Sequence, residues 1–155
     1  MRITRESALF DLKEIRAAIV EDLSVLGKAE ELQVVKYMLA LPTPPTIQVT
    51  GAGEILYDVA MQAGGGANRG GDQNDVVVQA FVSMVSDQAG QEKLDRLLTS
   101  SGPSSIKEAI EEGVALAAIV DAFRVTKCSG SEIYPRADQT VVVGASWTVQ
   151  VETSG

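Results

Sequence analysis

The most glycine-dense stretch of the chain, Gly64 to Asp72, is where the residue types first suggest a chemical function. Consecutive glycine amides can surround an anion, so the stretch could form a phosphate cradle. Phosphate loops of that kind continue through Lys-Ser or Lys-Thr into a helix, whereas this stretch leads into a strand pattern without such a pair. It is therefore predicted to be a flexible connection between two strands. One variant of that prediction is an arm that orders only against a neighbouring subunit.

The paired carboxylates are weak candidates for acid–base catalysis or metal binding. The first two pairs have the flanking pattern of solvated charges at helix ends. The third pair adjoins the glycine-rich stretch and could hold a cation, but two carboxylates supply fewer oxygens than calcium requires. The first two pairs are Glu30–Glu31 and Glu111–Glu112, and the third is Asp72 with Asp75.

The chain contains one cysteine, Cys128, and no histidine. Catalytic arrangements that need an imidazole are therefore excluded, as are His-containing metal sets and any disulfide within the chain. Cys128 lies on a predicted strand where the only adjacent cation is Lys127, so we expect a buried, unreactive thiol. No residue set stands out for catalysis, and we expect no enzyme, no cofactor and no metal site.

The chain has 155 residues, the size of one domain that can bury a substantial core. Its residues are 45% hydrophobic but only 5% aromatic, so we expect an aliphatic core with Phe81, Phe123 and Trp147 as its large anchors. The net charge is −8, and Arg69 is the only cation in residues 37–91. Tight nucleic-acid binding needs clustered cations and is not expected. No signal peptide or membrane span is predicted, which indicates a protein that stays in a cytoplasm or in a particle assembled there.

Two long stretches alternate between apolar and other residues with the period of a β-strand. In Asn74–Ser86 every even position from Val76 to Met84 is apolar, which predicts a strand with one fully buried face. The C-terminal stretch has one apolar face and one that becomes polar toward its end, which is typical of an antiparallel strand on a core. The apolar face of that second strand comprises Val141, Val143, Ala145, Trp147, Val149 and Val151.

An amphipathic helix is predicted near the N-terminus. Its polar side includes Arg16, its start is expected to be capped by Thr4 or Ser7, and Gly27 is expected to end it in a left-handed cap. The apolar stripe that would cover the core comprises Leu12, Ile15, Ile19, Leu23 and Leu26.

Two further helices are predicted after the central strand. The first spans Asp87–Leu98 and follows a possible Ser86 cap. The second opens with a capping box in which Ser105 and Glu108 satisfy each other's backbone amides, and Gly113 is expected to end it.

Shorter strands and connections complete a predicted α+β domain. Strands are expected at Leu32–Leu39, Thr46–Thr50, Glu54–Val59 and Ala122–Cys128, with a turn at Gly51-Ala52-Gly53 and a buried connection at Val114–Val120. The result is a mainly antiparallel sheet with helices packed on one face. No repeat or linker divides the chain, so residues 1–155 are expected to form a single domain with a flexible glycine-rich loop at 64–72.

Much of the chain resembles the tail terminator proteins of long-tailed, non-contractile bacteriophages, especially those that infect actinobacteria. The matching segments follow one another in the same order and at similar spacing along most of the chain. They are Tyr37–Ile47 (YMLALPTPPTI), Ile55–Met61 (ILYDVAM), Val82–Asp87 (VSMVSD), Gln91–Leu98 (QEKLDRLL), Ser104–Glu111 (SSIKEAIE), Val120–Thr126 (VDAFRVT) and Trp147–Val151 (WTVQV). The glycine-rich loop is longer than that family's pattern, and Ser129–Glu132 stands where an aromatic residue often follows the glycine.

The resemblance implies a structural virion protein at the neck, the top of the tail, assembled in the cytoplasm of a host bacterium. Such proteins form a ring, usually of six copies, that caps the tail tube, ends its polymerisation and joins the tail to a head-tail connector. The implied partners are further copies of the chain, the tail tube protein, the connector protein, and genomic DNA that passes through the lumen without specific binding. No membrane is involved. Residues expected at the subunit or tail-tube interface are Tyr57, Met61, Asn68, Arg69, Asp72 and Asp75.

Two properties of the residues agree with that implication, and two alternatives stay open. Unpaired strand edges and a glycine-rich arm suit head-to-tail association, and an acidic balance from residues such as Glu54, Asp72 and Asp75 suits a lumen to which DNA does not stick. One alternative is another virion component, such as a tail tube or head-tail connector subunit. The other is a small enzyme that binds a phosphate ligand in its glycine-rich loop.

Overall fold

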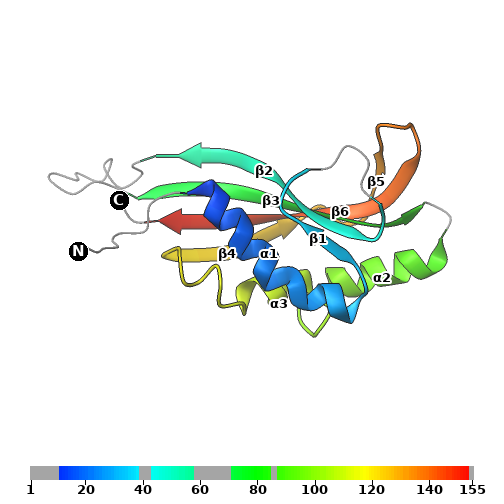
Figure 1. The fold of residues 1–155 in the computed structure, drawn as a ribbon, viewed down its shortest axis with the longest axis horizontal. Coiled ribbons are helices and arrows are strands. Elements are labelled where there is room, and N and C mark those ends of the chain that lie inside the picture. Colours follow the sequence, from blue (N-terminus) through cyan, green and yellow to red (C-terminus); the bar gives the residue numbers. More distant parts are fainter. Residues whose placement is uncertain (1–10, 39–42, 58–70, 85–86, 154–155) are drawn as a thin grey trace, which may run out of the picture.

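The computed structural model describes residues 11–38, 43–57, 71–84 and 87–153. Three helices and six strands lie within these residues (Figure 1). In chain order they are α1 (Leu12–Ala29), β1 (Gln33–Val35), β2 (Thr46–Leu56), β3 (Asp72–Met84), α2 (Gln88–Leu98), α3 (Ile106–Glu111), β4 (Ala122–Cys128), β5 (Glu132–Pro135) and β6 (Val141–Thr153).

The six strands form one mixed sheet with β3 and β6 at its centre. The strand order is β1-β2-β3-β6-β4, and β5 pairs with β6 beyond the end of β4. Only the β1–β2 pair is parallel among these described strands, and the others are antiparallel. The helices pack on one face of the sheet (Figure 1), which confirms the predicted α+β architecture.

The pairing of β3 with β6 puts the two predicted alternating strands side by side. Val78 lies opposite Trp147, so the apolar faces of both strands share the side that is covered by the helices. Trp147 is only 3% exposed, whereas Val141, at the start of β6, is 40% exposed and departs from the predicted buried face. The remaining buried members of this face are Val76, Val78, Ala80, Val82, Val143, Ala145, Val149 and Val151.

The three expected aromatic anchors do not share one core. Phe81 pairs with Gly144 and therefore faces the side of the sheet opposite the helices, where its ring meets the edge of Tyr134 at a centroid distance of 5.3 Å. Phe81 is nevertheless buried, with only 5% of its surface exposed. Phe123 is partly buried against the main core below the helices. Gly144 is needed at this crossing because a Cβ there would lie 2.0 Å from the Ala80 carbonyl oxygen.

Helix α1 has the predicted stripe but different ends. Asp11 is the N-cap, and its carboxylate accepts a hydrogen bond from the Glu14 amide at 3.3 Å. The predicted caps Thr4 and Ser7 lie outside the described residues. Gly27 sits inside the helix, which runs on to Ala29, so its predicted role as the stop is wrong. Glu31 takes the left-handed conformation instead, with φ 54°.

Arg16 was expected on the solvated side of α1 but is only 9% exposed. Its guanidinium donates to the carbonyl oxygens of Lys36 at 2.8 Å and Val49 at 2.7 Å, and lies 4.7 Å from the centre of the Tyr37 ring. The prediction fails because these carbonyls lie where β1 ends, and a buried carbonyl without a strand partner needs another donor. Arg16 therefore ties α1 to the sheet edge.

Strand β2 is one continuous strand where two strands and a turn were predicted. The chain does not reverse at Gly51-Ala52-Gly53; register shifts between Val49 and Gly51 and between Ala52 and Ile55 absorb extra residues as bulges. Bulges of this kind bend a strand without ending its pairing. The preceding strand, β1, covers three residues instead of the eight predicted, and Tyr37 and Met38 beyond it are exposed.

The two short helices start close to where the sequence predicts. Asp87 caps α2 by accepting from the Ala89 amide at 3.1 Å, while the alternative cap, Ser86, lies outside the described residues. In α3 the Ser105 hydroxyl accepts from the Glu108 amide at 3.0 Å, as predicted. The Glu108 carboxylate, however, accepts from the Gly102 amide at 3.1 Å, so the reciprocal half of the capping box closes the preceding loop.

The connection Val114–Val120 is only partly buried. Leu116 is fully buried, but Val114 is 78% exposed, so the prediction of a buried segment is wrong at its start. The cause is Asp22 on α1, whose carboxylate accepts from the amides of Ala115 at 3.0 Å and Leu116 at 3.1 Å. These two hydrogen bonds fix the segment so that Leu116 points inward.

Replacing Trp147 with alanine should lower the free energy of unfolding by roughly 3–5 kcal/mol. The substitution would remove a large buried side chain and leave a cavity between the central strands and the helices. The measurement is chemical denaturation of the purified protein. Val141→Ala is the matched control, since Val141 belongs to the same strand but is 40% exposed. A loss for Trp147→Ala no larger than that for Val141→Ala would contradict the assignment of Trp147 to the core.

Candidate assembly surfaces

Exposed apolar side chains gather in separate places on the molecule. Large apolar side chains on a surface mark contacts with other molecules when they cluster, whereas single ones are ordinary. The exposed set comprises Val25 (56%), Tyr37 (52%), Met38 (63%), Leu56 (43%), Tyr57 (65%), Val114 (78%), Ile133 (61%) and Val141 (40%).

The first cluster, here called the β2-end surface, consists of Leu56, Tyr57, Asp72 and Asp75. The last pair between β2 and β3 is Leu56 with Gln73, so Tyr57 and the start of β3 lie at the same end of the sheet. Three of the six predicted interface residues are thus brought together, with Tyr57 the most exposed. The other three, Met61, Asn68 and Arg69, lie outside the described residues.

Asp72 and Asp75 cannot share a cation in this arrangement. Asp72 pairs with Thr153 and Asp75 with Gln150 on β6, and residues three apart on a strand point to opposite faces. Within the residues that the structure describes, no group of three or more His, Cys, Asp or Glu side chains could hold a metal ion. The β2-end surface therefore carries two separated charges on opposite faces of the sheet.

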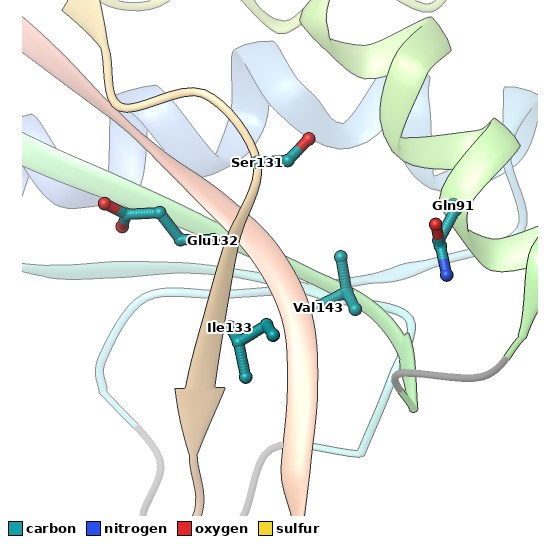
Figure 2. Close-up of a pocket in the computed structure, with 5 residues that line it drawn as sticks. All are labelled: Gln91, Ser131, Glu132, Ile133 and Val143. Carbon is teal, nitrogen blue, oxygen red and sulfur yellow. The ribbon is translucent and has the colours of Figure 1, made fainter.

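A groove, here called the β5 groove, lies at the other end of the sheet between α2 and the β5–β6 hairpin. The groove has a volume of about 620 Å³. Figure 2 shows Gln91 of α2 and Ile133 of β5 on either side of Val143 of β6. Ile133 is 61% exposed beside it. The full lining is Gln91, Ser131, Glu132, Ile133 and Val143.

The sequence prediction missed β5, and with it this groove. The strand is held by a hairpin tip in which the Arg136 amide donates to the Thr140 carbonyl at 2.7 Å and Asp138 accepts from the Thr140 amide at 3.1 Å. On its other side, Tyr134 packs against Phe81. The alternation of Ile133 with polar neighbours, followed by an Asp-containing turn and the valines of β6, is a hairpin signal that could have revealed it.

The described strands differ in how much of their outer edges is blocked. Along β4, the Val125 amide donates to the Glu111 carboxylate at 2.9 Å, so an incoming strand would find this position occupied. No described strand pairs with the outer edge of β2 beyond Gln48, nor with the outer edge of β5. Unpaired edges of this kind are sites where another chain can add a strand.

Glu111 was predicted to be a solvated charge at a helix end, but the structure does not bear this out. Partial burial opposes ionisation, but the pKa of Glu111 is lowered overall by hydrogen bonds from the Lys107 ammonium at 2.6 Å and from the Val125 amide. The carboxylate therefore stays charged while it blocks the β4 edge.

The sheet face opposite the helices carries charges of both signs along the described strands. By the strand register, this face carries three carboxylates and two cations, together with amide and hydroxyl side chains and an apolar group around Phe81 and Tyr134. Its described residues include no cluster of cations of the kind that raises the affinity for DNA through counterion release. The charged residues are Asp75, Glu132, Glu152, Arg124 and Lys127.

Cys128 is exposed, which corrects the prediction of a buried thiol. Its sulfur is nevertheless partly desolvated, which raises the pKa of the Cys128 thiol, and the charge of Glu132 adds to the effect. The Gly130 amide donates to this sulfur at 3.3 Å but does not reverse the shift. The thiol therefore carries little thiolate at neutral pH and is a weak nucleophile.

Glu30 was predicted to be a solvated charge at a helix end but is only 7% exposed. The Arg96 guanidinium donates to both of its carboxylate oxygens, at 3.0 and 2.9 Å, and the Ser104 hydroxyl also donates to it. These hydrogen bonds, that of Arg96 first, lower the pKa of Glu30 against the opposing effect of burial. Glu30 joins α1, α2 and the loop before α3.

Comparisons with known proteins give only distant structural likenesses. No protein-family model matches the chain, and no curated protein does. A chain in the virion of a native gene transfer agent particle aligns with 11% identity and a TM-score of 0.45, over 92% of this chain and 96% of that one. Full-length ShkA in complex with AMPPNP aligns with 12% identity and a TM-score of 0.36, over 99% of this chain and 32% of that one. Likenesses at these TM-scores support no conclusion about function.

No helix among the described residues is both long and apolar enough to cross a membrane.

Acid should destabilise the protein in part through Glu30. Because its pKa is lower in the folded state, the stabilisation is fully present above the ordinary glutamate value of about 4.3 and is lost as the pH falls through the folded value. Glu30→Gln should cost roughly 1–3 kcal/mol at pH 7 and flatten the pH dependence of unfolding below about pH 4.5.

The measurement is denaturant unfolding across that pH range. Glu14→Gln is the matched control, because Glu14 is exposed on the same helix and only its backbone amide takes part in the N-cap. Equal pH profiles for Glu30→Gln and the unaltered protein would contradict this role of Glu30.

Proposed function

We propose that the chain is a structural virion protein that assembles into a closed ring of six copies at the top of a phage tail. The ring caps the tail tube, ends its polymerisation and joins the tail to a head-tail connector. The sequence resemblance to tail terminator proteins suggests this role. The observation that carries it is the presence of two unlike contact surfaces at opposite ends of one sheet.

Two unlike surfaces are what a closed ring requires. In head-to-tail association, one patch of a subunit binds a different patch of the next, and the contact closes into a ring if the rotation allows it. The β2-end surface and the β5 groove differ in shape and composition. They lie ten residues apart along β3, between the pairing partners of Leu56 and Val143, which corresponds to about 30 Å. They therefore cannot meet within one subunit.

The sheet face opposite the helices suits a lumen through which DNA moves. Its described charges are three carboxylates and two cations, and its other polar groups are amides and hydroxyls such as Gln79, Thr148 and Gln150. A face without clustered cations has a low affinity for DNA, because binding there releases few counterions. The predicted acidic character is thus replaced, on the described strands, by a near-neutral polar character that serves the same purpose.

The two alternatives make different predictions for assembly and binding. A tail tube subunit stacks without limit into tubes, whereas a terminator ring closes and stops. A phosphate-binding enzyme would release or absorb heat when titrated with nucleotides, and we expect none. Electron microscopy and calorimetry of the purified protein separate these three possibilities.

The two surfaces can be tested by complementation. Tyr57→Asp disables the β2-end surface and Ile133→Asp disables the β5 groove, because both place a charge in an apolar contact. Each variant alone should fail to form rings. A mixture of the two should form dimers, since one intact pair of surfaces remains, as native mass spectrometry would show.

Val114→Asp is the matched control, because Val114 is also apolar and exposed but lines neither surface. It should leave the rings intact. Rings that survive either single aspartate substitution, or a mixture that stays monomeric, would contradict head-to-tail assembly through these surfaces. Open tubes from the unaltered protein would favour the tail tube alternative.

A further inference from the structure

A second groove, here called the α1–α3 groove, lies in the helical layer between α1, α3 and the loops that flank α3. It has a volume of about 580 Å³, and its wall includes the exposed apolar side chains Val25 and Val114. The lining residues are Glu21, Asp22, Ser24, Val25, Ala29, Gly102, Pro103, Ser105, Glu108, Ala109, Glu112, Gly113 and Val114.

The charge of this groove is one-sided. Four of its lining side chains are carboxylates, and none of the described lining residues is Lys or Arg. Two of the four stabilise the fold through hydrogen bonds. Asp22 accepts them from the backbone amides of Ala115 and Leu116, and Glu108 accepts one from the backbone amide of Gly102. The other two, Glu21 and Glu112, are exposed at the groove.

The exposure of Val25 and Val114 has a structural cause. Val25 lies next to Leu26 of the buried stripe but on the other side of the helix, and Val114 is held out because Asp22 directs the following residues inward. Exposing such side chains offers the folded chain no gain in burial. Covering them with a partner would remove them from water, which is favourable.

From these features we infer that the α1–α3 groove binds a basic amphipathic helix of another protein. A groove between two helices accepts a third helix whose apolar side covers the valines. Lys or Arg residues on the flanks of that helix would pair with Glu21 and Glu112, which gives the charge complementarity. The inference does not rest on the proposed ring, because the groove shares no lining residue with the β2-end surface or the β5 groove.

The test uses the full chain and a fluorescent synthetic helix of about 15 residues, with leucines on one side and lysines on the other. A second peptide carries glutamates in place of the lysines. Fluorescence anisotropy should show binding of the lysine peptide and none of the glutamate peptide. Replacing both valines (Val25→Ser with Val114→Ser) should weaken binding of the lysine peptide about tenfold or more.

Charge is tested separately from apolar contact. Glu21→Gln with Glu112→Gln should weaken binding and make it less sensitive to salt. Glu14→Gln with Glu92→Gln is the control of equal net charge, since both residues are exposed on helices but do not line the groove. This control should bind like the unaltered protein.

Two outcomes would overturn the inference. If the control pair weakens binding as much as the Glu21 and Glu112 pair, or the valine pair has no effect, the peptide responds only to the overall negative charge. If the valine pair instead abolishes self-association in sedimentation experiments, the groove receives a second copy of the chain. The first outcome leaves the complementation test of the ring unaffected, because Tyr57 and Ile133 do not line the α1–α3 groove. The second outcome would appear in that test as well, because the control Val114→Asp would then disrupt the rings.

Discussion

The antiparallel pairing of β3 with β6 is the constraint on which the rest of the structure depends. Each strand has 13 residues, and the register places Val76 opposite Val149 and Val78 opposite Trp147. Because side chains alternate from face to face, a shift of one residue would turn the apolar set of one strand away from the helices. The ladder therefore decides which side of the sheet the helices must cover.

Charged residues of α1 and its C-cap, Glu30, then attach the less regular segments to this platform. Arg16 holds the end of β1 and the β2 edge, Asp22 holds the segment after α3, and Glu30 holds α2 through Arg96. All three are at most 9% exposed, and each is satisfied by hydrogen bonds to backbone or to opposite charge. Buried charges are tolerated only under that condition. One helix thus supplies both the apolar cover of the sheet and the polar contacts that position the loops.

The same arrangement determines where other molecules can bind. Glu111 occupies the outer edge of β4, while the edges of β2 beyond Gln48 and of β5 have no described strand beside them. Apolar side chains are exposed near both of these edges and in the helical layer. Surfaces in different directions suit the proposed ring, because neighbouring copies and partners above or below a ring approach from different sides.

The sequence by itself determined the regular elements. Alternation predicts β3, β4 and β6, and the spacing of Leu12, Ile15 and Ile19 predicts α1, because these patterns repeat with the local periods of strand and helix. Short-range hydrogen bonds such as the Ser105 cap are equally visible, since both partners lie within one turn. The α+β class follows from the order of these elements.

Only the tertiary structure decided how partners distant in the chain meet. Arg16 has the sequence context of a solvated residue, and its burial depends on carbonyls 20 and 33 residues away. Glu30 meets Arg96 across 66 residues. The continuity of β2 through its glycines depends on β3 pairing with both halves, and the β5 groove depends on a hairpin folding beside α2. No local pattern encodes these contacts, because their free energy arises only when separate segments are brought together.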